Sequence, residues 1–339
     1  MKDRTYIILD LFSGAGGFSE GFLRAGFKIK KHFYSEIDKH AIACYKHNFK
    51  NSEYVGSVTD VQGITDRIKQ YRADKPECGL IITFGSPCQD FSLAGKRAGM
   101  DGERSSLISR AIEIISIIRP DVFIWENVKG AFSSNSGADF WAIIQAFTDL
   151  RYDRLEWQLL NTAWLLPQNR ERIYLVGHLG EGSGRNVFPI GEDFERIDEV
   201  SKGISRTANT RTLSAGGKSG GLHSDMTLIK IASATNSGYE EATEGDSINL
   251  SQPNSETRRG RVGKGKAQTL ETSCNQAVIQ DRIRRLTEIE TERLQGFKDD
   301  HTKYGNYDGE VKEISRTQRY KLMGNAISVP IVELIANRL

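Results

Sequence analysis

The sequence predicts a doubly wound α/β fold with a mostly parallel, Rossmann-like sheet, joined to a smaller and irregular domain of β character. Short apolar runs alternate with segments of helical spacing over about the first 180 of the 339 residues. Between about 181 and 280 the chain is rich in Gly, Ser, Thr and Asn instead. Helical spacing returns at 286–297 and 327–339, so we expect residues 281–339 to rejoin the domain formed by residues 1–180.

The predicted elements follow one another in a regular order. An apolar strand begins at Tyr6 and runs into a glycine turn at 13–17, after which 18–25 has helical spacing. Further strands are expected near 30–35, 79–84, 121–126, 154–160 and 171–177. Helices are expected near 38–47, 62–72, 105–118 and 137–149. In the second domain, 181–280, 226–231 is a short strand candidate.

The composition excludes several classes of protein. Apolar residues make up 38% and charged residues 27%, which is typical of an ordered globular chain. No apolar run approaches the roughly 20 residues of a membrane span, and the first residues have no signal-peptide profile, so we expect a cytoplasmic protein. We expect it to be a monomer. The four cysteines lie far apart and form no C-x-x-C pair, which argues against both a disulfide framework and a thiolate metal site. The net charge of +2 gives no sign of a polyanionic partner.

The glycine turn predicts a ligand site at the end of the first strand. A nicotinamide fingerprint requires G-x-G-x-x-G, but Ser19 stands where a third glycine would follow Gly14 and Gly16. About 20 residues later, Glu36 ends the next strand, where a carboxylate can accept hydrogen bonds from ribose hydroxyls. The pattern fits an adenosine-containing cofactor, and an ordinary tight turn is the alternative.

Cys88 stands apart from the other cysteines. It follows Pro87 directly after a buried-strand pattern, and the next residues form a polar loop with glycines and basic residues, as in a mobile lid. Cys44 and Cys78 have the surroundings of buried packing residues. We therefore interpret Cys88 as a candidate nucleophile at the edge of the sheet.

Two more strands bring charged residues to the same edge. One strand delivers Glu126, and Arg170 and Arg172 stand just before another. Each alone is typical of an ordinary ion pair or a solvated charge. Together with Cys88 and the glycine turn they form a catalytic constellation.

These segments resemble the DNA cytosine-C5 methyltransferases, which use S-adenosylmethionine. Six segments match in the family's order and cover nearly the whole chain outside 181–280. They are DLFSGAGG (10–17), GSPCQ (85–89), ENV (126–128), QNRERIY (168–174), RLT to LQGF (285–297) and GNAISVP (324–330).

The resemblance implies a role for each catalytic residue. Cys88 would attack C6 of cytosine, because C5 is a poor nucleophile until a thiolate adds at C6 and makes C5 enamine-like. Glu126 would hydrogen-bond and protonate N3, and Arg172 would bind the O2 side of the ring. Arg170 would position Cys88, the loop or the base. The target base must also be flipped out of the helix. The motifs do not identify the base that removes the C5 proton.

The resemblance also implies a set of residues for S-adenosylmethionine and its product S-adenosylhomocysteine. Two positions depart from the family pattern. Ser57 stands where many relatives have an aspartate for the adenine amino group, with Asp60 as the rival, and Ile37 stands in place of an aromatic residue. The complete set is Phe12, Gly14, Gly16, Glu36, Ile37, Ser57, Val58, Pro87, Leu107, Asn325 and Ser328.

The resemblance implies double-stranded DNA as the partner, in a bacterial or phage-infected cell. The sequence does not reveal whether a cognate restriction endonuclease, which need not bind directly, accompanies the protein. The stretch 258–266 holds five basic residues in nine and no acidic one, as expected of a phosphate or guanine reader. Thr269 begins a Thr-Leu element for which Thr212 is the rival placement. The expected DNA contacts are Ser92, Lys96, Arg97, Arg104, Arg258, Arg259, Arg261, Lys264, Lys266 and Thr269.

Three other functions compete with this one. A cytosine-C5 methyltransferase acting on tRNA would share the catalytic core, but such relatives tend to carry a Cys-Phe-Thr element and no cysteine here precedes Phe. A non-catalytic DNA-binding protein of the same fold would have no need of Cys88, Glu126 and Arg172. A nicotinamide enzyme is disfavoured by Ser19. The sequence therefore predicts a DNA (cytosine-5-)-methyltransferase.

Overall fold

A seven-stranded sheet forms the centre of the protein in a computed structural model that describes residues 4–86, 107–132, 137–152, 154–179, 186–191, 229–252, 257–280 and 283–339. All neighbouring strands are parallel except β8, which runs antiparallel to both of its neighbours. This sheet confirms the predicted fold class. In spatial order the strands are β3 (Ser52–Tyr54), β2 (Lys28–Ser35), β1 (Thr5–Leu11), β4 (Gly79–Gly85), β5 (Val122–Val128), β8 (Glu171–His178) and β6 (Arg154–Asn161).

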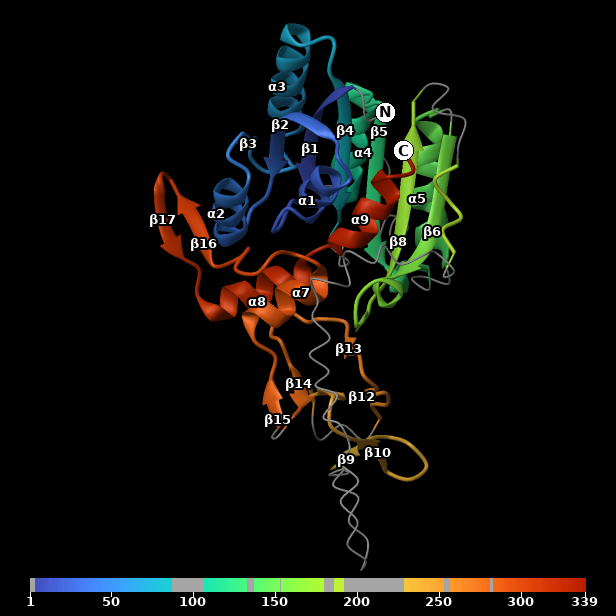
Figure 1. Ribbon diagram of the computed structural model, residues 1–339. Coiled ribbons are helices and arrows are strands. Elements are labelled where there is room, and N and C mark those ends of the chain that lie inside the picture. The colour runs from blue at the N-terminus through green and yellow to red at the C-terminus, as the bar shows by residue number, and fades with distance from the viewer. Residues whose placement is uncertain are drawn as a thin grey trace, which may run out of the picture.

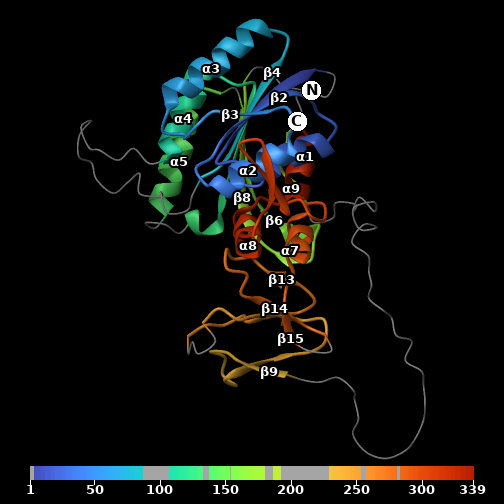
Figure 2. The same ribbon diagram turned by 90° about the vertical axis from the view of Figure 1, so that its left-hand side faces the viewer.

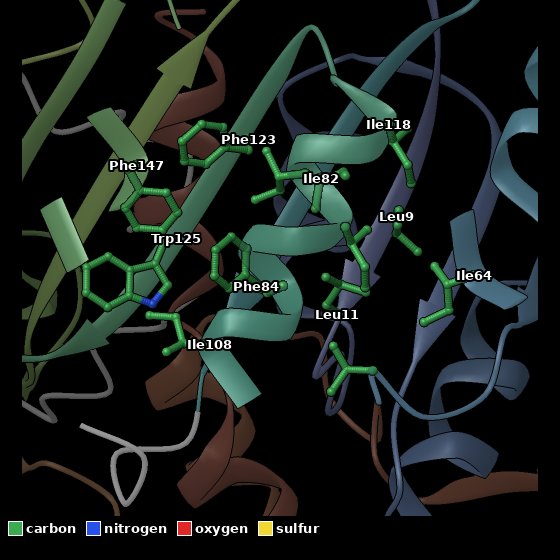
Figure 3. Close-up of a cluster of buried hydrophobic side chains, with 14 of the residues drawn as sticks. Leu9, Leu11, Ile64, Ile82, Phe84, Ile108, Ile118, Phe123, Trp125 and Phe147 are labelled. Atoms are coloured by element: carbon green, nitrogen blue, oxygen red, sulfur yellow. The ribbon is translucent and has the colours of Figure 1, made fainter. Parts of the chain in front are cut away.

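Helices cover both faces of the sheet (Figures 1 and 2). One face packs against α3 (Val61–Asp74), α4 (Leu107–Ile118) and α5 (Ala138–Asp149), and the other against α1 (Gly17–Arg24) and α9 (Val329–Ala336). Figure 3 shows the first of these cores, in which alternate strand residues such as Leu9, Ile82 and Phe123 meet the helices. Because both faces are covered, the strands are apolar at nearly every position, which explains the continuous apolar runs in the sequence.

The strand order reverses between β1 and β4, and this switch point determines where a ligand can bind. Strands β2 and β3 continue to one side of β1, and β5 continues to the other side of β4. The glycine turn follows β1 and Ser86 follows β4, so both lie at the edge of the sheet where ligands bind in such folds.

The glycines of α1 allow the last helix to come close to the first. A Cβ on Gly21 would lie 2.6 Å from Val332 Cβ, and one on Gly17 would lie 2.9 Å from the Ile327 carbonyl oxygen. Residues 187–190 also pack into this core, and Gln158 of the edge strand β6 exchanges hydrogen bonds with Ile190. They lie beyond residue 180, where the first domain was expected to end.

A smaller module of short strands lies below the carboxyl edge of the large sheet (Figure 1). A two-residue parallel pairing between β7 (Gln168–Asn169) and β13 (Ala267–Gln268) joins it to the large domain. Its four-stranded sheet ends in β15, three to five residues beyond the expected boundary at 280. Besides β13, the described strands of the module are β9 (Ile229–Ala232), β10 (Tyr239–Ala242), β11 (Ser247–Asn249), β12 (Val262–Gly263), β14 (Gln276–Ile279) and β15 (Ile283–Arg285).

The C-terminal segment packs on the large domain. Helix α7 (Glu288–Gln295) begins with a capping box between Thr287 and Glu290. A hairpin that the sequence did not reveal follows, formed by β16 (Tyr304–Tyr307) and β17 (Glu310–Glu313), and it packs beside α2 (Lys39–Asn48). Helix α8 (Arg316–Asn325) then leads to α9. None of the helices in the described ranges has both the length and the apolar character needed to cross a bilayer.

Candidate active site

The turn after β1 has a backbone that glycine makes possible. Gly14 and Gly16 have φ angles of +52° and +84°, and Phe12 also adopts a positive φ of 54°. Ser13 N–H donates to the Ser35 carbonyl at 3.1 Å, and Gly16 N–H donates to the Ser13 carbonyl at 2.9 Å. The turn is therefore closed on itself and tied to the end of β2. A Cβ on Gly14 would meet no described atom within 4 Å, so the turn is open on that side.

Glu36 fastens this turn from the end of β2. Its Oε2 accepts from Gly14 N–H at 2.9 Å, and its Oε1 accepts from the N–H groups of Ile37 at 2.8 Å and Asp38 at 3.0 Å. Oε2, which accepts only from Gly14, has a further lone pair with which to accept from a hydroxyl group. Ile37 is 79% exposed directly beside it, which is unusual for an isoleucine. The pair offers a polar and an apolar contact at one place.

Asp60 and Ser57, the rival adenine contacts, have different roles. Asp60 caps α3, and its Oδ1 accepts from Gly63 N–H at 3.0 Å. Ser57 Oγ lies 2.9 Å from Thr59 Oγ1 within the same turn and is partly exposed. Both side chains therefore take part in local turn contacts, and both stay candidates for the adenine contact. Val58 is a buried residue of the apolar core beside Ser57.

The opposite side of the switch point is formed by the turn between α8 and α9. Asn325 is exposed, whereas Ser328 is 1% exposed at the start of α9. The hydroxyl oxygens of Ser328 and Ser13 are buried with no hydrogen-bond partner among the described residues. Buried polar atoms seldom lack a partner in folded proteins. The residues around the glycine turn therefore fit a polar ligand such as S-adenosylmethionine, and Phe12 and Leu107 pack on the apolar core beside it.

Glu126 and Arg172 meet at the ends of β5 and β8. Arg172 Nε lies 3.1 Å from Glu126 Oε1, and their side chains are 13% and 9% exposed. That carboxylate oxygen has no well-aligned hydrogen bond from a described residue. Gly85 lies opposite Glu126 on β4, and a Cβ there would come within 3.0 Å of Glu126 Oε2. The glycine thus leaves space for the carboxylate where β4 ends.

Arg170 is buried behind this pair and serves another part of the site. Its Nη2 donates to the Ala326 carbonyl at 2.7 Å and its Nη1 to the Gly324 carbonyl at 3.4 Å. Burial, together with the nearby Arg172, lowers the pKa of the Arg170 guanidinium to about 9. Arg170 therefore holds the turn that follows Asn325, a contact that differs from the predicted positioning of Cys88, the loop or the base.

Asn127 is a functional candidate to which the sequence assigned no role. Its Nδ2 donates to Ser86 Oγ at 2.9 Å and to the Ser86 carbonyl at 3.2 Å, and Trp125 Nε1 donates to Ser86 Oγ at 3.1 Å. These bonds fix the last described residue before Pro87 and Cys88. The predicted residues Pro87, Cys88, Ser92, Lys96, Arg97 and Arg104 lie outside the described residues, and the other three cysteines are buried.

The basic stretch 258–266 divides into structural and exposed side chains. Arg261 is 3% exposed and donates to the carbonyls of Asn249 and Ala232, the latter at 2.7 Å. Lys264 pairs with Asp246 at 2.7 Å, although its side chain is 63% exposed. Lys266 is exposed. Arg261 thus fits the role of a scaffold residue, a distinction that the sequence could not make.

The two remaining arginines of this stretch, Arg258 and Arg259, each contact another residue of the module. Thr269 contacts the residue that precedes Arg170. Arg258 approaches Glu271 at 3.4 Å, and Arg259 Nε donates to the Ala234 carbonyl at 2.7 Å. Thr269 Oγ1 donates to the Asn169 carbonyl at 2.8 Å, immediately before Arg170. The Thr-Leu element at 269–270 is therefore near the candidate active site, and Thr212 lies outside the described residues.

The chain matches a known protein family over nearly its whole length. The family model for C-5 cytosine-specific DNA methylases matches residues 6–339. The chain is 32% identical over 337 residues to the type II methyltransferase M.NgoBI of Neisseria gonorrhoeae, a match that covers 97% of this chain and 91% of that protein. It is 29% identical over 340 residues to the type II methyltransferase M1.ScrFI of Lactococcus lactis subsp. cremoris, covering 100% of this chain and 79% of that protein.

Solved structures show the same fold. The Dnmt2 methyltransferase of S. pombe superposes with a TM-score of 0.55 at 15% identity and covers 97% of this chain and 96% of its own. The methyltransferase EhMeth of Entamoeba histolytica superposes with a TM-score of 0.56 at 14% identity, covering 98% of this chain and 96% of its own. At these identities the similarity concerns the fold alone. In the described part of the chain, no three His, Cys, Asp or Glu side chains gather as metal ligands would.

Proposed function

Because the chain belongs to the C-5 cytosine-specific DNA methylase family, we propose that it methylates a flipped-out cytosine in a specific duplex sequence through a covalent bond between Cys88 and C6. Its relatives include type II methyltransferases, which are of the restriction–modification type. The observation that carries the proposal is the Glu126–Arg172 pair, in which Oε1 of the carboxylate lacks a well-aligned hydrogen bond. A carboxyl and a guanidinium side by side match the N3 and O2 edge of cytosine.

In the proposed reaction the protein activates the ring and then releases it. Cys88 would add as a thiolate to C6 while Glu126 protonates N3, which moves the ring electrons toward C5. Arg172 would bind O2 and orient the ring. After C5 has taken the methyl group, loss of the C5 proton and expulsion of Cys88 would restore the aromatic ring. The bonds from Asn127 and Trp125 to Ser86 support this assignment, because they fix the chain two residues before Cys88.

S-adenosylmethionine would bind at the switch point between β1 and β4. Glu36 would accept hydrogen bonds from the ribose, and Ile37 and Val58 would contact the adenine, with Ser57 or Asp60 as its polar partner. Ser328 and Asn325 would contact the rest of the molecule from the other side. The bound cofactor would supply an electrophilic methyl group.

Residues 181–280 would form the target-recognition domain between the two catalytic parts, 1–180 and 281–339. Lys266 and Arg259 would contact DNA phosphates, with Thr269 at the catalytic edge. The residues outside the described ranges, Ser92, Lys96, Arg97 and Arg104, would add contacts from the loop after Cys88. The partner would be double-stranded DNA, acted on by a monomer in the cytoplasm, and a cognate endonuclease would cut the unmethylated sequence.

Transfer of a labelled methyl group tests the proposal. Purified protein should transfer label from S-adenosylmethionine to mixed-sequence duplex DNA and not to bulk tRNA, and Cys88→Ala should abolish the transfer. A protein that labels only the tRNA, or that labels neither substrate, would contradict the proposal. Full activity of Cys88→Ala would contradict the assignment of the nucleophile.

A further inference from the structure

His301 connects the C-terminal segment to the glycine turn. It lies in the loop between α7 and β16, and its Nε2 is 2.8 Å from the Ala15 carbonyl oxygen. The side chain is 1% exposed. Because a carbonyl oxygen can only accept, Nε2 must carry the hydrogen, which fixes the tautomer of the ring. A residue near the end of the chain thus donates to the turn after the first strand.

This hydrogen bond holds one end of a peptide unit whose other end is also held. The unit consists of the Ala15 carbonyl and the Gly16 N–H, and that N–H donates to the Ser13 carbonyl at 2.9 Å. Gly16 caps α1 with a φ of +84°, and the Phe49 ring occupies the place that a Cβ would take. With both ends of the peptide bonded, its plane cannot rotate without breaking one of the bonds. The path of the turn is set by this plane.

The loop around His301 is built to hold the imidazole in place. The His301 ring packs on the Phe297 ring with centroids 4.4 Å apart, and the His301 carbonyl accepts from Asn48 Nδ2 at 2.9 Å. The N–H groups on either side, of Asp300 and Thr302, donate to the carboxylate of Glu292 at 2.8 and 2.9 Å.

Glu292 itself is fully buried and paired. Its Oε1 lies 2.9 Å from Arg319 Nη2 on α8, so the loop, α7 and α8 share one polar network. A buried ion pair with several hydrogen bonds specifies geometry more than it stabilises the fold. The network therefore orients the backbone on both sides of His301.

We infer that His301 is a positioning residue for the cofactor site, which sets the glycine turn in its binding conformation through the Ala15 carbonyl. The inference rests on the proposed S-adenosylmethionine site. His301 does not touch the reacting atoms in this account, because it lies behind the turn. Its loss should weaken cofactor binding and raise the KM for S-adenosylmethionine, while kcat at saturating cofactor and the affinity for DNA stay nearly unchanged.

Three variants separate hydrogen bonding from packing. His301→Leu fills much of the same space without a donor, whereas His301→Gln places an amide N–H near the position of Nε2. Tyr307→Phe is the matched control, because it removes another hydrogen bond of the same segment, 2.7 Å from His40 Nδ1, without touching the glycine turn.

The dissociation constants of S-adenosylmethionine and S-adenosylhomocysteine are measured by calorimetry for all three variants. We expect about five- to tenfold weaker binding for His301→Leu, recovery to within about threefold for His301→Gln, and no change for Tyr307→Phe. Should His301→Leu fail to fold, His301→Asn, whose shorter amide falls short of Ala15, takes its place with the same expectation.

Wild-type affinity in His301→Leu, or equal losses in the Leu and Gln variants, would overturn the inference. A wild-type protein that binds neither ligand would instead overturn the proposed cofactor site, so the two failures are distinguishable.

Discussion

Arg172 and Glu126 form a nearly buried ion pair between neighbouring antiparallel strands, with Nε 3.1 Å from Oε1. The two residues come from segments 46 positions apart, and the sheet register brings them together beside the end of β4. Because both are shielded from water, their attraction is strong and each orients the other. The proposed chemistry depends on this relationship.

Glu126→Gln tests the acid role of the carboxyl group. The amide keeps the shape and can still contact N3, but it cannot give up a proton as the carboxyl does. We expect kcat to fall by about 10²- to 10⁴-fold, with S-adenosylmethionine affinity unchanged. Single-turnover methyl transfer measures the effect. A loss of less than about tenfold would contradict a proton-transfer role for Glu126.

Arg170→Met and Arg172→Met form a matched pair two positions apart. Arg170 donates to two buried carbonyls, so its replacement should lower the free energy of unfolding by about 3 kcal/mol and weaken cofactor binding through the 324–326 turn. Arg172→Met should mainly lower kcat. Urea unfolding and initial rates measure both quantities. The reverse pattern would show that the two roles are exchanged.

Lys266→Ala and Arg261→Ala distinguish an exposed from a buried basic residue. Lys266→Ala should weaken DNA binding and reduce the slope of log K against log salt by about 0.9, with stability unchanged. Arg261→Ala should destabilise the module, because it leaves the carbonyls of Asn249 and Ala232 unpaired. Fluorescence anisotropy at several salt concentrations and thermal unfolding provide the readouts. An unchanged salt slope for Lys266→Ala would exclude a phosphate contact.

Acidification should destabilise the protein through its buried histidines. Burial lowers the pKa of His32 to about 4, against about 6.5 in the unfolded chain. Between these values the unfolded chain takes up a proton that the folded protein does not, so stability is lost as pH falls below about 6.5. The loss at pH 5 relative to pH 7 should be about 1–2 kcal/mol for this residue. Urea unfolding of wild type and His32→Gln at both pH values measures it, and an identical loss in both would contradict the assignment.

Much of the fold could be predicted because its signals are local. Buried parallel strands give apolar runs, and the glycine turn reveals itself by residues that tolerate positive φ, so β1, α1, β4 and β5 lie within a few residues of their expected positions. The β16–β17 hairpin was missed because its strands are four residues long and β17 is exposed throughout, which leaves no apolar alternation.

Only the residues of the candidate site that stand in recognisable motifs could be named from the sequence. Glu126 and Arg172 could be named from the motifs in which they stand. Other features depend on contacts between segments far apart in the sequence. These are the hydrogen bonds from Arg261 to Ala232, from Asn127 to Ser86 and from His301 to Ala15. No local pattern in the sequence encodes them, since each depends on which carbonyl a distant segment presents. The one local sign of such a buried polar contact was a polar residue within a largely apolar strand, such as Asp10 or Asn127.

The position of the transferred methyl group tests the central claim most directly. Plasmid DNA from cells that express the protein is digested to nucleosides for mass spectrometry, and a second sample is sequenced after bisulfite treatment. We predict 5-methylcytosine confined to one short recognition sequence, and none in cells that express Cys88→Ala. Methylation at N4 of cytosine or N6 of adenine, or no methylated base above the level of cells without the protein, would contradict it.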